Sequence, residues 1–446
     1  MKEIHIYKLG AITTGAVAMM FAVAIGVPEL REVSYEAAPG AALAAGTDSQ
    51  DEPDVRPVVR HQALPPEVKS IYMTACVVGT RDFRDRLVAL IEETEINSVI
   101  IDVKDFSGTI SFPPESPNWR PAWDAAKCGT ADMKSFIESL HQKGIYVIAR
   151  ITVFQDPFYT KLRPDLAVKR ADGVSVWHDH KGLSFIDVGA REYWDHIVEL
   201  SRDSYNIGFD ELNFDYVRYP SDGPMTDIAF THSKTYPGDI DKQANLEEFF
   251  RYLNEKLDDE LLYSEYRHVD TGRASSTPWT SADLFGMTTT NYDDLSIGQV
   301  QERAAPYFDF IAPMVYPSHY PKNVFGYVNP NDHPYEIVYH AMKTGVNRMM
   351  ASTTPMMGFE HTRVGTSTPV VYQKPSFGPE KFRTWIQDFD YGGDYDAADV
   401  RAQIKASEDA GVQSWMIWAP SNIYTKEALE SAETQFTGGC QSESDC

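Results

Sequence analysis

The spacing of hydrophobic positions changes repeatedly along the chain from residue 69 onward. Short runs rich in β-branched and aromatic residues predict strands at residues 70–75, 98–103, 146–152, 211–216, 280–284, 308–315, 384–389 and 414–418. Apolar residues at helical spacing predict helices at residues 82–93, 132–143, 191–206, 244–262, 296–307, 335–346 and 397–410. Such alternation is typical of βα units around a parallel sheet, so we expect an α/β fold.

The number of predicted strands favours a closed sheet. Eight strands in roughly 350 residues fit a (β/α)8 TIM barrel with enlarged βα loops. A doubly wound sheet is the alternative, but neither GxGxxG nor GxxxxGK[ST] follows the first predicted strand. The pattern therefore indicates neither a dinucleotide site nor a P-loop, and we expect no cofactor.

The N-terminal region differs in composition from the predicted barrel. Residues 9–28 are apolar and uncharged, and Lys2 and Lys8 flank them. About 20 such residues span a bilayer, so we expect a transmembrane anchor with residues 1–8 cytoplasmic and the barrel outside. A cleaved signal segment, which would give a secreted protein, is the alternative. We further expect a flexible linker at residues 29–67, the barrel domain at 68–430 and a disordered tail at 431–446.

Charge and cysteine content narrow the range of partners. The chain has 40 Lys and Arg against 65 Asp and Glu, and its net charge of −25 disfavours nucleic acid as a partner. Cys440 and Cys446 could close a small ring in the tail, and Cys76 and Cys128 follow predicted positions that can approach each other. The HDH segment 178–180 has no third ligand at usable spacing, so a surface loop is favoured over a metal site.

The segment at residues 208–220, GFDELNFDYVRYP, carries the clearest candidate chemistry. Alternate strand residues share a face, so we expect Glu211, Asn213 and Asp215 to point into the barrel. At ~3.3 Å per residue, Glu211 lies about 13 Å from Asp215, too far for both to act on one bond. Asp215 closes its strand at the end where barrel enzymes place their chemistry, and Arg218 lies on the following loop. A structural ion pair is the alternative interpretation.

Glycosidic cleavage requires a second carboxyl group. Asp102 ends the predicted strand 98–103 and is expected to share a face with Lys104, although these two residues could form only a buried ion pair. Asp283 ends the predicted strand 280–284 and could instead cap the next loop. Both residues remain open as partners of Asp215.

Further residues near the ends of predicted strands are expected to bind substrate. They are Lys104, Arg150, Asn213, Arg218, Tyr316, His319, Tyr320, Gln387 and Trp418. Polar groups among aromatic rings suit a sugar, because rings cover its C–H surfaces and polar groups bind its hydroxyls. Each of these residues could also belong to the core or to the rim.

Several segments together resemble a bacterial family of glycoside hydrolases, which are exported proteins with a glycosidase-type TIM barrel. The segments are 71–74, 97–105, 144–151, 208–220, 281–286, 313–320, 385–389 and 415–424. The resemblance implies Asp215 as the nucleophile or its equivalent and nominates Asp283 as the acid; the family's substrate is unassigned. Ala419 departs from an acidic residue common in that family. Val217 replaces the proton-donating Glu of the chitinase pattern DGxDxDxE, which disfavours substrate-assisted cleavage.

The leading hypothesis is a glycosidase that acts on an extracellular or cell-wall polysaccharide. Asp215 and Asp283 would form the working pair, with Asp102, Lys104 and Arg150 adjusting the charge around them. A catalytically inactive carbohydrate-binding barrel is the alternative. A deacetylase on the same scaffold would need a metal cluster, which the motifs do not indicate.

Overall fold

The computed structural model describes residues 54–234, 240–366 and 368–432. The predicted basic end 1–8, the segment 9–28, most of the linker and the tail beyond residue 432 lie outside these residues. The helices within the described ranges include none that is long and apolar enough to cross a membrane.

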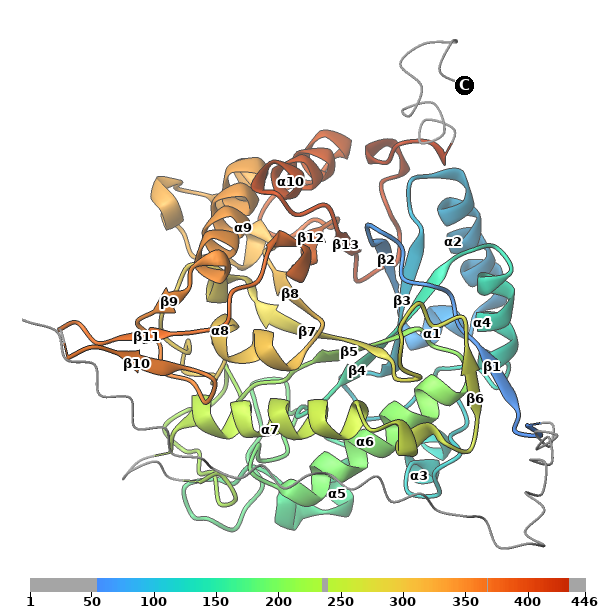
Figure 1. Cartoon of the computed structure of the whole chain (residues 1–446), viewed down its shortest axis with the longest axis horizontal. Coiled ribbons are helices and arrows are strands. Elements are labelled where there is room, and N and C mark those ends of the chain that lie inside the picture. The colour runs from blue at the N-terminus through green and yellow to red at the C-terminus, as the bar shows by residue number, and fades with distance from the viewer. Residues whose placement is uncertain (1–53, 235–239, 367, 433–446) are drawn as a thin grey trace, which may run out of the picture. The chain divides into compact units, whose positions relative to one another are not determined.

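Eight parallel strands close into a barrel, as the sequence predicts (Figure 1). In chain order they are β2 (Lys69–Met73), β3 (Ser98–Lys104), β4 (Tyr146–Thr152), β5 (Glu211–Asp215), β7 (Trp279–Phe285), β8 (Phe310–Met314), β12 (Thr384–Gln387) and β13 (Trp415–Trp418). The pairing of β12 with β8 on one side and β13 on the other completes the ring. The fold is therefore a TIM barrel.

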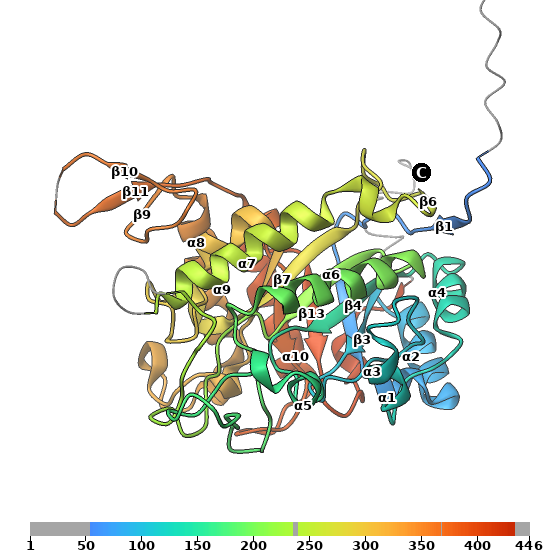
Figure 2. The same cartoon turned by 90° about the horizontal axis from the view of Figure 1, so that it is seen from below.

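Helices cover the outside of the barrel, and Figure 2 shows α6 and α7 along one side. The long helices are α2 (Arg81–Glu93), α4 (Met133–His141), α6 (Arg191–Asn206), α7 (Lys242–Leu257), α9 (Pro334–Met350) and α10 (Ala397–Ala410). Short ones are α1 (Ala75–Val78), α3 (Arg120–Asp124), α5 (Tyr159–Leu162) and α8 (Gln301–Ala304). Single 3₁₀ turns are η1 (Pro164–Leu166), η2 (Glu260–Tyr263), η3 (Gly286–Thr289), η4 (Ala305–Tyr307), η5 (Pro317–His319), η6 (Val324–Gly326), η7 (Pro330–Asp332), η8 (Pro379–Lys381) and η9 (Lys426–Ala428).

Two hydrophobic layers follow from the alternation along the strands. Leu212 and Phe214 of β5 belong to the large cluster between the barrel and its helices. Residues such as Ile148 and Trp385 belong to a smaller cluster inside the barrel. Because neighbouring strand residues point to opposite sides, the inward series of β5 is polar while its outward series is apolar.

The predicted linker ends earlier than expected. β1 (Val58–Arg60) pairs in parallel with β6 (Arg267–Val269), and the two strands lie side by side in both views (Figures 1 and 2). His61 is buried and forms a 2.9 Å hydrogen bond with His268. The compact unit therefore begins at Arg56 rather than at residue 68. Composition alone missed this pairing because its partner lies about 200 residues further along the chain.

The predicted helix 296–307 is also wrong over its first half. Leu295, Ser296 and Gly298 have positive φ angles of 53°, 58° and 86°, which an α-helix does not accommodate. The helical part is reduced to α8 and η4. An additional antiparallel sheet of β9 (Thr353–Thr354), β10 (Thr362–Val364) and β11 (Val371–Gln373) projects from the barrel (Figure 1).

Cys76 and Cys128 form a disulfide, as their predicted positions allowed. Cys76 lies in α1, directly after β2, and Cys128 lies after α3. The bond therefore ties the segment that follows β2 to the segment that follows β3. Cys440 and Cys446 lie outside the described residues.

Candidate active site

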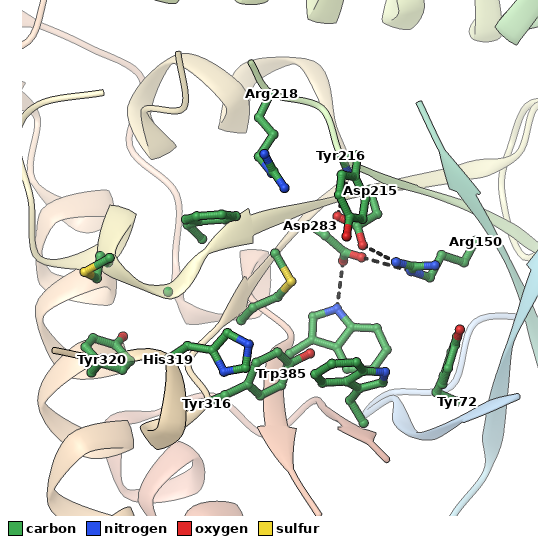
Figure 3. A pocket seen from close by; sticks show the side chains of 15 residues that line it. Tyr72, Arg150, Asp215, Tyr216, Arg218, Asp283, Tyr316, His319, Tyr320 and Trp385 are labelled. Atoms are coloured by element: carbon green, nitrogen blue, oxygen red, sulfur yellow. Dashed lines mark hydrogen bonds and ion pairs between the residues drawn. The ribbon is translucent and has the colours of Figure 1, made fainter. Parts of the chain in front are cut away.

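A cavity of about 260 Å³ opens at the C-terminal ends of the barrel strands (Figure 3). Its walls are Tyr72, Arg150, Asp215, Tyr216, Arg218, Asp283, Phe285, Gly286, Met287, Met314, Tyr316, His319, Tyr320, Trp385 and Trp418. Eight of the predicted site residues are among them: Arg150, Asp215, Arg218, Asp283, Tyr316, His319, Tyr320 and Trp418. Their convergence follows from the parallel strands, whose C-terminal ends share one face of the barrel.

Arg150 of β4 lies at the centre of three carboxyl groups. Its Nη1 donates to Asp102 Oδ1 at 2.6 Å, and its Nη2 donates to Asp215 Oδ2. Its Nε lies 3.8 Å from Asp283 Oδ2. One guanidinium group therefore compensates a cluster of acids that would otherwise repel one another.

Asp215 is held as a hydrogen-bond acceptor on both oxygens. Besides the bond from Arg150, Oδ1 accepts a 2.5 Å bond from the backbone N–H of Tyr216. Tyr216 has a φ of 51°, a left-handed conformation that costs a tyrosine on the order of 1–3 kcal/mol. The hydrogen bonds from the Tyr216 N–H and from Arg150 fix the orientation of the Asp215 carboxylate.

Asp283 lies in a different environment. Its Oδ1 accepts hydrogen bonds from Trp385 Nε1 at 2.7 Å and Asn213 Nδ2 at 2.9 Å. Its buried Oδ2 accepts no hydrogen bond from the described residues. Burial, followed by the nearby charge of Asp215, raises the pKa of Asp283 to about 8. This environment therefore favours the protonated form of Asp283.

Asp102 supports the cavity from behind and does not line it. It is 3% exposed and accepts hydrogen bonds from Arg150 and from the Tyr72 hydroxyl. Burial raises the pKa of Asp102 to about 6. Of the two acids that the sequence left open, only Asp283 shares the cavity with Asp215.

Aromatic rings form one side of the cavity. The ring centroids of Tyr316 and Trp418 are 5.1 Å apart, and His319 lies 6.3 Å from Trp418. Burial lowers the pKa of His319, which keeps this imidazole neutral near pH 7. This side of the cavity therefore combines flat apolar faces with uncharged polar atoms, as expected of a sugar site.

The prediction that Lys104 shares a face with Asp102 is wrong. The register between β3 and β4 shifts between these two residues, so Lys104 leaves the inward series. Its fully buried Nζ donates to Thr152 O at 2.6 Å and lies 3.1 Å from Asp156 Oδ2. Lys104 thus holds the loop after β4 and does not line the cavity.

Two other predicted residues, Asn213 and Gln387, do not line the cavity but hold residues at or near it. Asn213 orients Asp283, as described above. Gln387 is fully buried. Its Oε1 accepts a 2.7 Å hydrogen bond from the Ser318 hydroxyl and a second hydrogen bond from the Ser318 backbone N–H. It therefore positions the loop that carries His319. His178 and His180 are exposed in a loop, as predicted.

The positions of Tyr72, Tyr216 and Trp385 in the cavity were not predicted from the sequence. Trp385 has the same strand parity as Gln387, so its inward direction could have been inferred. Its hydrogen bond to Asp283 could not, because the bond joins residues 102 positions apart across the barrel, and local spacing does not predict contacts at that separation. The left-handed turn at Tyr216 has no sequence signal either, because Tyr is uncommon there.

Comparisons with known proteins concern the family and the fold of this chain. Residues 70–424 match the DUF4015 family, described as "Putative glycosyl hydrolase domain". No curated protein matches the chain. A hypothetical protein from Ruminiclostridium thermocellum is 27% identical, covers 42% of this chain and 93% of its own, and has a TM-score of 0.37.

Two solved structures share the fold at low identity. The glycoside hydrolase domain of PgaB (BpsB) from Bordetella bronchiseptica is 12% identical over 84% of this chain and 99% of its own, with a TM-score of 0.51. Alpha-L-fucosidase isoenzyme 2 from Paenibacillus thiaminolyticus is 12% identical over 84% of this chain and 50% of its own, with a TM-score of 0.51. With a family match over most of its length and a TIM barrel that presents two carboxyl groups at its mouth, the chain belongs to the DUF4015 family of glycosyl hydrolase domains.

Proposed function

We propose that this protein hydrolyses glycosidic bonds in an extracellular or cell-wall polysaccharide, with Asp283 as the general acid and Asp215 as the nucleophile or base. The observation that carries the proposal is the contrast between two carboxyl groups of one cavity. Asp283 is buried with its Oδ2 accepting no hydrogen bond from the described residues, which favours its protonated form, whereas Asp215 accepts hydrogen bonds on both oxygens. Glycosidic hydrolysis requires this division between a proton donor and a carboxylate.

The geometry suggests how the two groups divide the reaction. Asp283 gives its proton to the leaving glycosidic oxygen, while its Oδ1 stays bound to Trp385 and Asn213. Asp215 attacks the anomeric carbon or removes a proton from an attacking water. Arg150 contacts both carboxyl groups, so it stabilises the negative charge left on Asp283 after proton transfer.

We also propose that the barrel functions outside the cytoplasm, held there by residues 9–28 or secreted. Two observations support this location. The apolar, uncharged segment follows a basic end, and Cys76 and Cys128 form a disulfide, which persists mainly in oxidising compartments. Separation of cytoplasmic, membrane and exported fractions tests it. The intact barrel in the cytoplasmic fraction alone would contradict it.

Reducing-end assays over a panel of polysaccharides test the catalytic proposal. We expect Asp283→Asn and Asp215→Asn each to lower turnover by roughly 10²–10⁴-fold, the contribution of a positioned acid or base. Asp124→Asn, the same change in an exposed pair on α3, is the matched control and should keep full activity. If Asp102→Asn abolishes turnover while Asp283→Asn does not, the working pair is Asp102 and Asp215. If the protein binds sugars but releases no reducing ends, it is the inactive carbohydrate-binding barrel.

A further inference from the structure

Arg218 lies in the cavity as a second guanidinium group, and no acid within the described part of the chain is paired to it. It is 8% exposed and enters the cavity from the loop after β5 (Figure 3). Its Nη1 donates to Tyr219 O at 3.1 Å and Ser221 Oγ at 3.2 Å. No carboxylate among the described residues forms an ion pair with it; Asp215 and Asp222 act on it only at longer range.

Aromatic rings hold this guanidinium in place. Its Cζ lies 4.6 Å from the Tyr216 ring centroid, 4.9 Å from that of Phe285 and 5.9 Å from that of Phe185. Such contacts stabilise a cation but do not replace a counter-ion. Because a buried charge is costly without a partner, an unpaired Arg facing a ligand cavity indicates that the ligand supplies the missing negative charge.

The charges along the cavity wall agree with this interpretation. The wall contains two guanidinium groups, Arg150 and Arg218, and two carboxyl groups, Asp215 and Asp283, and burial favours the protonated form of Asp283. Arg150 is already paired with Asp215 and Asp102. Arg218 is therefore the guanidinium group of this wall that no described carboxylate contacts; its printed hydrogen bonds go to a backbone carbonyl and a hydroxyl.

We propose that Arg218 recognises an anionic substituent, a carboxylate or a sulfate ester, on the sugar unit held in the cavity. The substrate would then be an acidic polysaccharide. This rests on the proposed function, which it extends to a substrate class. A guanidinium binds planar carboxylates and sulfate groups through paired N–H donors, so Arg suits this role better than Lys.

The acidic surface of the protein does not oppose this assignment. The net charge of −25 is spread over the whole chain, and at physiological salt exposed charges are screened over about 8 Å. A contact inside the cavity is screened far less. The surface charge slows the approach of a polyanion but does not set the preference of the cavity.

Calorimetric titration of the whole chain with single sugars tests the proposal without relying on hydrolysis. The probes are D-glucuronate, D-galacturonate and D-glucose 6-sulfate against D-glucose, D-galactose and D-glucosamine. We expect at least one acidic sugar to bind roughly 10- to 100-fold more tightly than its neutral counterpart. The arm that binds identifies the anionic group. Equal or tighter binding of the neutral sugars or of glucosamine, or no binding of the acids, overturns the proposal.

Variants assign any preference to Arg218. Arg218→Gln should lose it, and Arg218→Lys should keep part of it. Arg86→Gln removes a cation that also lies over a phenyl ring, 4.9 Å from Phe83, but on the exposed face of α2, and should leave the preference intact. An acid preference that survives in correctly folded Arg218→Gln contradicts the assignment. Hydrolysis of a neutral polysaccharide that depends on Asp283, without acid preference, would reject the substrate class and leave the proposed function standing.

Discussion

Trp385→Phe is a sharp test of how the barrel sets the proton affinity of Asp283. The indole N–H of Trp385 donates to Asp283 Oδ1 at 2.7 Å, and this bond lowers a pKa that burial and Asp215 raise to about 8. Phe keeps an aromatic ring but removes this donor together with part of the indole volume, a loss that the Trp279→Phe control below shares. The pKa of Asp283 should therefore rise, because a hydrogen bond stabilises the carboxylate more than the acid.

The size of the shift follows from the two protonation states. A hydrogen bond to a charged group contributes roughly 1.5–3 kcal/mol, and one to a neutral group roughly 0.5–1.5 kcal/mol. The difference of about 1–1.5 kcal/mol corresponds to roughly one pKa unit. Since the general acid must be protonated, activity should decline above about pH 8 in the wild type and about one unit higher in Trp385→Phe.

The assay is kcat/KM against pH, each profile normalised to its own maximum so that a change in stability does not affect the midpoint. Trp279→Phe is the matched control. Trp279 lies on β7, and its Nε1 donates to no described residue, so its loss should leave the midpoint in place. A basic midpoint in Trp385→Phe that stays fixed or moves down would refute the assignment of Asp283 as the acid.

Three further predictions concern stability and packing. The pKa of Asp283 is near 8 in the folded state and about 3.9 in the unfolded state, so its protonation stabilises the fold fully below pH ~4, and this stabilisation is lost as the pH rises through ~8. Between about pH 5 and pH 9, the Tm of Asp283→Asn should therefore fall less than the Tm of the wild type. Arg383 is 1% exposed and forms a 2.6 Å bond with Glu211 Oε2, so Glu211→Gln removes its counter-ion, and urea unfolding should show a free energy of unfolding lower by about 3–5 kcal/mol. Asp409→Asn, the control in an exposed ion pair, should leave the urea midpoint unchanged. Gly286→Ala places a Cβ 2.4 Å from Met314 O, so β7 and β8 must separate at the cavity, and we expect the stability to fall by about 1–3 kcal/mol and kcat/KM to fall as well. Unchanged stability and unchanged kcat/KM would contradict the close packing.

Much of the fold could be predicted because it depends on local periodicity. β4, α6 and α10 begin and end where the change between alternating and helical spacing indicates. The strand parity of β5 also predicts which side chains enter the barrel, since nothing interrupts that strand. Asp215 and Asp283 were found in this way, because the C-terminal ends of parallel strands share one face.

The remaining features depend on contacts that spacing does not contain. The expected direction of the Lys104 side chain is wrong because a register shift between Asp102 and Lys104 reverses the alternation, and no residue type in β3 indicates that shift. The pairing of β1 with β6 depends on burial of His61 against a distant segment. The proton on Asp283 depends on burial and on partners from three other strands, which only the closed barrel brings together.

The central claim, that Asp283 protonates the leaving group while Asp215 attacks or activates water, is tested most directly by changing the leaving group. Turnover of Asp283→Asn and Asp215→Asn is measured on the polysaccharide that the screen identifies and on the nitrophenyl glycoside of the same sugar, whose leaving group departs without protonation. We predict that Asp283→Asn loses roughly 10²–10⁴-fold on the polysaccharide but far less on the nitrophenyl glycoside, whereas Asp215→Asn is impaired on both. An equal loss on both substrates for Asp283→Asn, or full activity of that variant on the polysaccharide, would contradict the account.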